Sequence, residues 1–346
     1  MRVHPRTGEE IVTFARAAAN AVRRESARVA TGEISEASSR IFAGRIKNYL
    51  LPHFGDIGLP DINLAAINTF VDVLSARGLK RSSIRLILTS LRRIFYHAYL
   101  AEQVDAIPQM PRLSSDSSPR GGFGPEEYLR LWQVARRLIL EPPSMRVQSH
   151  RDTAGGLFSK DYPLLPTMPH LIRFMVNTFI RPTDLRWMQH KHIQIVRGRH
   201  LYLRMELPES KRHTTQIISM RPAVSIYESL LKAAGQQGTA GPDDYVFLPE
   251  VKNRKSAMIL LDLHFRRVLE ASQLRHGKRG QVRTLYSLRH TAITFRLLYG
   301  RGIDLLTLAR NARTSVEMIE RFYASELSAE MNIDLLHSRR SPINGK

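Results

Sequence analysis

The sequence predicts a two-domain protein in which a helical first domain precedes a second domain that combines helices with a small β-sheet. Three observations support this fold class. Apolar residues recur at helical spacing in the first third, a polar segment rich in Ser, Gly and Pro follows at 112–124, and alternating apolar residues occur only beyond it. A chain of 346 residues is long enough to build two hydrophobic cores.

Two helices are predicted between residues 40 and 78. The first presents one apolar face and is expected to end at Pro52 and Gly55. That face consists of Ile41, Phe42, Ile46, Tyr49 and Leu50. The second helix is expected to begin after the capping residue Asn63 and to stop at Gly78.

The segment 80–103 has the clearest helical period in the chain. Its apolar face consists of Ile84, Ile87, Leu88, Leu91, Phe95 and Ala98. The opposite face, which has no acidic residue, carries Arg85, Thr89, Arg92 and Tyr96. A polar face is often only solvated, but without acids this face is an equally good candidate for contact with phosphate groups.

The domain boundary is predicted from the prolines and the polar segment that follow this helix. We place the first domain at 1–115, a linker at 116–122 and the second domain at 123–346. A helix is expected to start at Pro125. The segments HLYLRMEL and TTQIISM have the pattern of strands, joined by a hairpin turn over PESKRH, and the other periodic segments of this domain read as helices.

The charge balance points to a polyanionic partner. Lys and Arg number 52 against 31 Asp and Glu, which gives a net charge of +21. On a folded chain such an excess favours nucleic acid, with a ribosome-associated or membrane-surface role as the alternative. The absence of cysteine excludes disulfides and Cys-ligated metals. Because no stretch has the ~20 apolar residues of a membrane helix, we expect a cytoplasmic, nucleoid-associated protein without membrane contact.

Cations lie among apolar residues in the segment TLYSLRHTAITFRLLYG, at 284–300. This segment and the residue before it carry Arg283, Arg289, His290 and Arg296. A cation in such surroundings is solvated, pairs with an acid or faces a bound anion. No acid occurs in the segment, which leaves solvent or an anion as the expectation.

Four segments of the second domain occur in an informative order: RPTDL at 181–185, ESKRH at 209–213, YSLRHT at 286–291 and TSVEMIERFYA at 314–324. Together they resemble the tyrosine recombinase (phage integrase) family, and the resemblance covers nearly the whole chain. It implies a SAM-like core-binding domain followed by a mixed α/β catalytic domain. It also implies a site-specific recombinase that cuts and rejoins DNA through a 3′-phosphotyrosine link and a Holliday junction, without metal, ATP or other cofactor.

The resemblance implies roles for individual residues. Tyr323 would be the nucleophile, and Arg181 and Arg289 would bind the scissile phosphate. Lys211 would protonate the leaving 5′-oxygen. Because Pro182 suits the first position of a helix, Arg181 is expected at a helix N-terminus, where backbone N–H groups favour an anion.

Other positions are supporting or depart from the family pattern. Asp184 would orient Arg181 or support its helix, and His290 would position Arg289 or simply pack beside it. Tyr286 and Thr314 stand where the family often has His or Trp, and each can still hydrogen-bond a phosphate oxygen. Arg313 stands where Gly is frequent.

The predicted partner is double-stranded DNA, bound by a homotetramer on two sites. The tail 325–346 has an apolar stripe that would dock on a neighbouring subunit or pack on its own domain. Residues 1–30 would be an extra element that contacts DNA or another subunit. The alternatives are a non-catalytic DNA-binding protein on the same scaffold and a type IB topoisomerase. A hydrolytic nuclease is disfavoured because no clustered carboxylates suggest metal sites.

Overall fold

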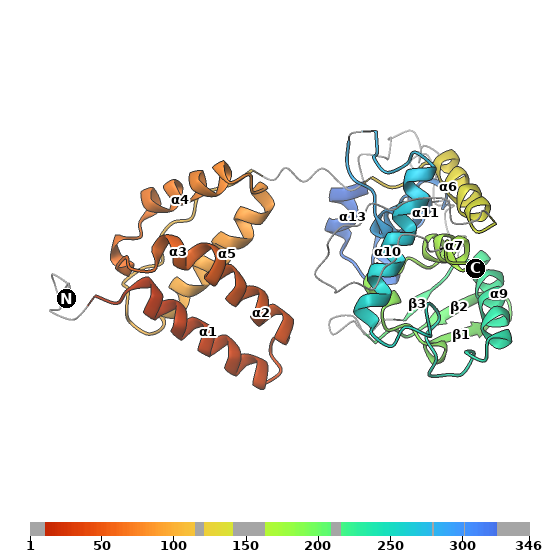
Figure 1. The fold of residues 1–346 in the computed structure, drawn as a ribbon, viewed down its shortest axis with the longest axis horizontal. Coiled ribbons are helices and arrows are strands. Elements are labelled where there is room, and N and C mark those ends of the chain that lie inside the picture. Colours follow the sequence, from red (N-terminus) through yellow and green to blue (C-terminus); the bar gives the residue numbers. More distant parts are fainter. Residues whose placement is uncertain are drawn as a thin grey trace, which may run out of the picture. The chain divides into compact units, whose positions relative to one another are not determined.

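The structure is a computed structural model that describes residues 11–114, 121–140, 163–208, 216–278, 280–300 and 302–323. The chain divides into two compact units, residues 1–118 and 119–346, which we term the helical unit and the α/β unit (Figure 1). Several predicted features lie outside the described residues, namely Lys211 with most of the hairpin turn, the tail 325–346, most of the linker and the first ten residues.

The helical unit contains five α-helices and two short helical turns in its described part. They are α1 (Phe14–Ala30), α2 (Glu36–Arg45), a π-helical turn (Ile46–Leu50), α3 (Leu51–Phe54), a 3₁₀ turn (Leu59–Asp61), α4 (Leu64–Ala76) and α5 (Arg81–Tyr99). Asn63 caps α4 by accepting a hydrogen bond from the Ala66 N–H at 3.1 Å, which confirms the predicted start. Gly78 follows the end of α4 with φ +76°, a conformation that favours glycine.

The region around residue 50 differs from the prediction in one respect. The helical segment continues past Pro52 through the π-helical turn and α3 to Phe54, and Gly55 is the C-cap of α3, which confirms the predicted end at Gly55. Proline is tolerated there because it lies in the first turn of α3. Ile41 is 54% exposed whereas Phe42 is buried, since neighbouring residues are about 100° apart around a helix.

The predicted apolar face of α5 is confirmed. All six of its predicted residues are at most 5% exposed. This face packs against the buried sides of α1, α4 and the π-helical turn, and together they form one hydrophobic core.

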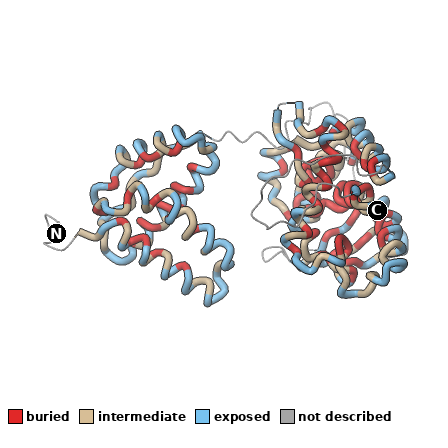
Figure 2. The backbone as a smooth tube through the Cα atoms, viewed as in Figure 1, coloured by how far each residue is buried: buried red, intermediate tan, exposed pale blue. Residues whose placement is uncertain are grey.

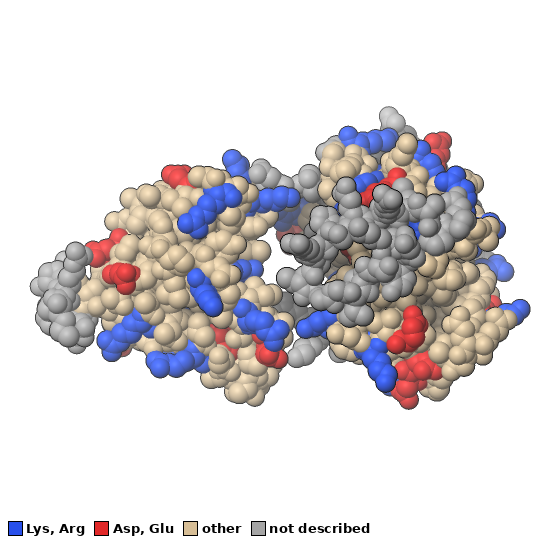
Figure 3. Space-filling model, viewed as in Figure 1, with Lys and Arg blue, Asp and Glu red and all other residues tan. Residues whose placement is uncertain are grey.

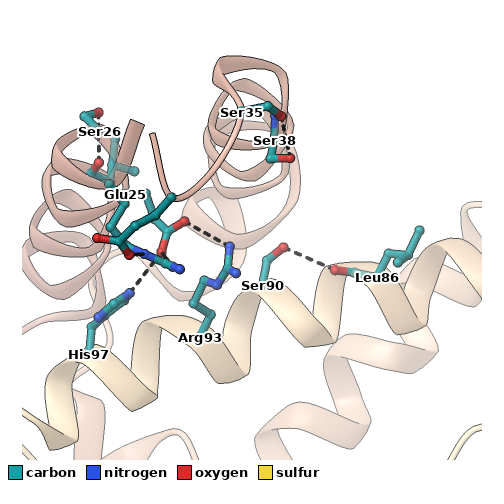
Figure 4. Close-up of polar contacts among 11 residues, drawn as sticks. Glu25, Ser26, Ser35, Ser38, Leu86, Ser90, Arg93 and His97 are labelled. Atoms are coloured by element: carbon teal, nitrogen blue, oxygen red, sulfur yellow. Dashed lines mark hydrogen bonds and ion pairs between the residues drawn. The ribbon is translucent and has the colours of Figure 1, made fainter. Parts of the chain in front are cut away.

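One buried carboxylate links α1 to α5. The Glu25 side chain is fully buried, and its oxygens accept hydrogen bonds from Arg28 Nη1 and Arg93 Nη1, each at 3.0 Å (Figure 4). His97 Nε2 lies 3.3 Å from the same carboxylate. Arg28 also pairs with Glu33 at 2.9 Å. We call these five residues the Glu25 cluster.

The α/β unit is also mostly helical in its described part. Its elements are α6 (Pro125–Leu138), α7 (Met168–Thr178), α8 (Pro182–Leu185), a 3₁₀ turn (His190–His192), β1 (Ile193–Val196), β2 (Tyr202–Met205), β3 (Ile217–Ile218), α9 (Pro222–Gln236), α10 (Arg254–Ala271), α11 (Leu285–Tyr299), α12 (Leu305–Asn311) and α13 (Val316–Tyr323). Pro125 begins α6, as predicted.

The three strands form an antiparallel sheet in the order β1-β2-β3. In its register Ile193 lies opposite Met205, and Arg204 lies opposite Ile218. Strands β2 and β3 fall in the two segments predicted as strands. The prediction missed β1, a four-residue strand in a polar context, and α9, whose Pro222 at the first position was an available signal. The predicted fold class, mostly helical with a small sheet, is confirmed.

Two hydrophobic clusters hold this unit together. The larger one surrounds α7, which is buried over most of its length in the interior of the unit (Figure 2). The smaller one joins α11, α12 and α13, and it includes Tyr323. Helix α11 takes part in both, because Leu285 and Leu288 belong to the first cluster and Ile293 to the second.

Candidate active site

The first site element is the N-terminus of α8. Arg181 is its N-cap residue, in an extended conformation, and Pro182 occupies the first helical position. Asp184 is 3% exposed, and its Oδ2 accepts a hydrogen bond from the Arg181 backbone N–H at 2.7 Å. Asp184 therefore supports the start of this helix. The Arg181 side chain is half-buried.

Arg289 is held by main-chain carbonyls. It is 2% exposed in the first turns of α11, and its two terminal nitrogens donate to the carbonyl oxygens of Phe179 and Ala312. Phe179 is the C-cap of α7, with φ +59°, and Ala312 is the C-cap of α12. Carbonyls at the C-terminal ends of helices attract a cation. The expectation of solvent or an anion was thus incomplete, although carbonyls of the described residues accept from only two of the five guanidinium N–H groups.

Arg283 also departs from that expectation. It is 3% exposed and pairs with Glu127 of α6 at 2.7 Å, with its guanidinium 4.6 Å from the centre of the Phe123 ring. Its partner is an acid 156 residues away in sequence, which no inspection of the local segment reveals.

The turn between α12 and α13 brings the two predicted phosphate-binding arginines together. Arg181 Nη2 donates to the carbonyl of Arg313, and Arg289 Nη2 donates to the carbonyl of the preceding residue, Ala312. Two guanidinium groups from segments more than 100 residues apart therefore lie on consecutive carbonyls. Thr314 follows in the same turn, half-buried, with its N–H bonded to the Ala309 carbonyl at 2.9 Å.

Tyr323 lies at the end of α13 and is 6% exposed. Its ring centre is 5.3 Å from that of His290, which in turn lies 5.1 Å from the ring of Tyr286. Burial raises the pKa of the Tyr323 phenol well above its usual range, and the charge of Arg289 only partly opposes this. The phenol is therefore neutral at pH 7.

The electrostatics of Arg289 connect the same residues. Burial lowers the pKa of its guanidinium, and the charge of Arg181 lowers it further. The same pKa is raised by the charges of Tyr286, Tyr323 and Asp184. The predicted catalytic and supporting residues that the structure describes thus lie around one locus.

Arg313 belongs to this locus, and the sequence indicated it only as a departure from glycine. It is 1% exposed, and its Nη2 lies 2.6 Å from Asp184 Oδ1. The contact has the length of an ion pair, although its angles fall outside those of a hydrogen bond. We call Arg181, Arg289, Arg313 and Asp184 the arginine cluster.

Asn311 ties the sheet to this turn. Its side-chain Oδ1 accepts from the Ile218 N–H at 2.8 Å, and its Nδ2 donates to the Ile218 carbonyl at 2.9 Å. The edge strand β3 is thereby paired with the residue that ends α12. Sequence patterns gave no signal for this contact, because an Asn at a helix end is common.

The predicted DNA-contacting face belongs to the helical unit. Arg85, Thr89, Arg92 and Tyr96 are all exposed along one side of α5. Arg85 also donates to the Leu113 carbonyl at 2.9 Å. Lys and Arg are spread over the visible faces of the two units (Figure 3). Among the described residues, no helix is long and apolar enough to cross a membrane, and no group of three or more His, Asp and Glu is placed to hold a metal.

Comparison of the sequence with protein-family models and with curated proteins gave no match. Solved structures do match. A lambda integrase dimer bound to a COC′ core site is 20% identical, with a TM-score of 0.62 over 90% of this chain and 77% of the integrase. A lambda integrase tetramer bound to a Holliday junction is 16% identical, with a TM-score of 0.64 over 91% of this chain and 78% of the integrase.

The Tn1549 transposon integrase in complex with transposon right end DNA is also similar. It is 15% identical, with a TM-score of 0.65 over 94% of this chain and 98% of that chain. These integrases are tyrosine recombinases, and the present chain has their fold. The resemblance found in the sequence motifs is therefore confirmed at the level of the fold.

Proposed function

We propose that the protein is a site-specific DNA recombinase of the tyrosine recombinase family. Tyr323 attacks a DNA phosphodiester, forms a 3′-phosphotyrosine link and releases a 5′-hydroxyl. The 5′-hydroxyl of a second strand then attacks this link, which forms a new phosphodiester and releases the Tyr323 phenol. Each step breaks one phosphate ester bond and forms another, so the reaction requires neither ATP nor a metal.

The arrangement of the arginine cluster is the observation that carries this proposal. The phosphorane formed during attack concentrates negative charge on its non-bridging oxygens, and fixed cations stabilise it. Arg181 and Arg289 are already held by consecutive carbonyls of one turn. Because a guanidinium presents its donors in a fixed plane, each can hold two phosphate oxygens.

The nucleophile requires activation when DNA binds. A neutral, buried Tyr323 neighbours Arg289, whose positive charge lowers the pKa of the phenol. Tyr286 and Thr314 would hydrogen-bond phosphate oxygens, His290 would hold the rings of Tyr286 and Tyr323 in place, and Lys211 would protonate the leaving oxygen.

DNA is the partner that best fits the charge and the fold. The net charge of +21 and the acid-free exposed face of α5 suit a polyanion. Similarity to integrases bound to DNA, including a tetramer on a Holliday junction, supports double-stranded DNA as substrate and a tetramer as the active assembly. In this assignment residues 1–115 are the core-binding domain, residues 123–346 are the catalytic domain, the tail 325–346 docks on a neighbouring subunit and the protein acts on a mobile element in the cytoplasm.

A covalent-trapping experiment tests the proposal. The protein is incubated with a pool of short duplexes of randomised sequence, each nicked so that the cleaved strand diffuses away, and the products are run on a denaturing gel. We expect a protein–DNA adduct from the intact chain and from Tyr299→Phe, a tyrosine that is 59% exposed, but none from Tyr323→Phe.

The same experiment separates the alternatives. Binding without any adduct would support the non-catalytic DNA-binding protein. Adduct formation together with relaxation of supercoiled plasmid, but without exchange between two duplexes, would support a type IB topoisomerase.

A further inference from the structure

Arg313 occupies a position that is unfavourable for an arginine in two respects. Its φ of +51° lies in the left-handed region, which residues with a side chain rarely adopt. Its side chain is 1% exposed, although a guanidinium is strongly hydrated. A residue that is unfavourable on both counts is retained only where its contacts compensate.

The contacts of Arg313 form a closed ring with Asp184 of α8 and with Arg181, the N-cap residue of this helix. Arg313 Nη2 lies 2.6 Å from Asp184 Oδ1, and Asp184 Oδ2 accepts from the Arg181 backbone N–H at 2.7 Å. The Arg181 side chain closes the ring by donating to the Arg313 carbonyl. Side chain and backbone of Arg313 therefore hold the same helix start from two directions.

This ring determines which arginine forms an ion pair with Asp184. Asp184 is three residues from Arg181 and already bonds its backbone, so the Arg181 guanidinium is a nearby cation with which it could pair. The ion pair of Asp184 is nevertheless with Arg313. In the described part of the chain, the hydrogen-bond acceptor of the Arg181 guanidinium is a carbonyl and not a carboxylate, so no acid there neutralises its charge.

We infer that Arg313 is a positioning residue that occupies Asp184 and thereby keeps the Arg181 guanidinium available for the scissile phosphate. This inference rests on the proposed function and deepens it. Without Arg313, Asp184 would pair with Arg181, and the phosphate would have to displace a carboxylate before it could bind.

Three variants test this inference in the trapping experiment. Arg313→Gly removes the cation and relieves the backbone, so we expect a folded protein whose rate of adduct formation falls at least tenfold at saturating DNA. In Arg313→Gly/Asp184→Asn no carboxylate remains to capture Arg181, and we expect most of the lost rate to return. Asp184→Asn alone serves as the reference for the double variant.

Several results would overturn the inference. An unchanged rate in Arg313→Gly would show that Asp184 does not compete for Arg181. Equal rates of adduct formation in Arg313→Gly and in Arg313→Gly/Asp184→Asn would mean that Arg313 serves only to stabilise the fold. If Arg313→Gly does not fold, Arg313→Asn replaces it in both variants, because Asn tolerates positive φ.

A crystal structure of Arg313→Gly gives a readout that does not depend on activity. The inference predicts that the Arg181 guanidinium moves from the residue 313 carbonyl onto Asp184 Oδ1, and an unmoved Arg181 would contradict it. If the intact chain forms no adduct, the proposed function fails, whereas adduct from the intact chain with an unmoved Arg181 rejects this inference alone.

Discussion

The Glu25 cluster and the arginine cluster both surround a buried carboxylate, but their charges balance differently. In the Glu25 cluster two acids, Glu25 and Glu33, pair with two arginines, and His97 is a further partner of Glu25. The arginine cluster contains one acid, Asp184, and three arginines, of which only Arg313 pairs with Asp184 through its guanidinium, so three positive charges minus one leave an excess of two.

This difference separates a structural cluster from a binding site. The charges of the Glu25 cluster balance, and its arginines reach solvent, so it needs no further partner. A buried excess of cations is stable only if carbonyl dipoles or an anion compensate it. Carbonyls supply part of that compensation for Arg181 and Arg289. The remainder fits an anionic ligand, and the proposed phosphodiester is such a ligand.

Removing a cation from the arginine cluster should have the largest effect. Arg289→Ala is expected to lower the rate of adduct formation by roughly 10³-fold, because a lost donor to the transition-state oxygens costs about that much. Single-turnover trapping measures the rate, and circular dichroism checks the fold. Arg296→Ala, a half-buried arginine on the same helix, is the control and should change the rate little.

Alkaline pH should affect the α/β unit through two tyrosines, Tyr227, which is buried, and Tyr128, which is partly buried. Burial raises the pKa of Tyr128 and of Tyr227 to about 12. A pKa that is raised in the folded state contributes stability below the unfolded pKa near 10, and this contribution is lost as the pH rises to about 12. For one tyrosine the loss is about 3 kcal/mol.

Tryptophan fluorescence reports on this unit alone, because both tryptophans, Trp132 and Trp187, lie in it. Urea unfolding followed by fluorescence at pH 9 and pH 11 should show a decrease in the free energy of unfolding that is smaller in Tyr128→Phe. The same decrease in the variant would show that Tyr128 is not its source.

The balanced cluster gives the smallest effect. Glu25→Gln leaves Arg28 and Arg93 without their buried acid and should lower the free energy of unfolding of the helical unit by about 2 kcal/mol, since both arginines are partly solvated. Urea unfolding followed by circular dichroism measures this. Glu36→Gln removes an exposed pair with Arg40 and should cost less than about 0.5 kcal/mol. Equal losses of unfolding free energy in Glu25→Gln and Glu36→Gln would show that the buried Glu25 contributes no more than an exposed ion pair.

Local periodicity was sufficient to predict much of the fold. The apolar face of α5, the Asn63 cap and the two strand segments follow from short patterns that need no distant partner. The π-helical turn and β1 were missed because each is short. Helix α9 was missed although it has 15 residues and its buried Ala223, Ile226, Tyr227 and Leu230 follow helical spacing.

The site was predicted less completely, for a physical reason. Motif order indicated which residues to examine, but their partners depend on contacts between distant segments. Arg181 and the Arg313 carbonyl are 132 residues apart, and Arg289 and the Phe179 carbonyl are 110 residues apart. Nothing in the sequence near Asp184 shows that Arg313 is its partner.

Identification of the modified residue tests the central claim most directly. The trapped protein–DNA adduct is digested with nuclease and protease, and mass spectrometry locates the peptide that retains a nucleotide. The structure predicts a 3′-phosphonucleotide on Tyr323, beside the excess positive charge of the arginine cluster. A nucleotide on another residue, with Tyr323 unmodified, would contradict the assignment of this cluster as the catalytic centre.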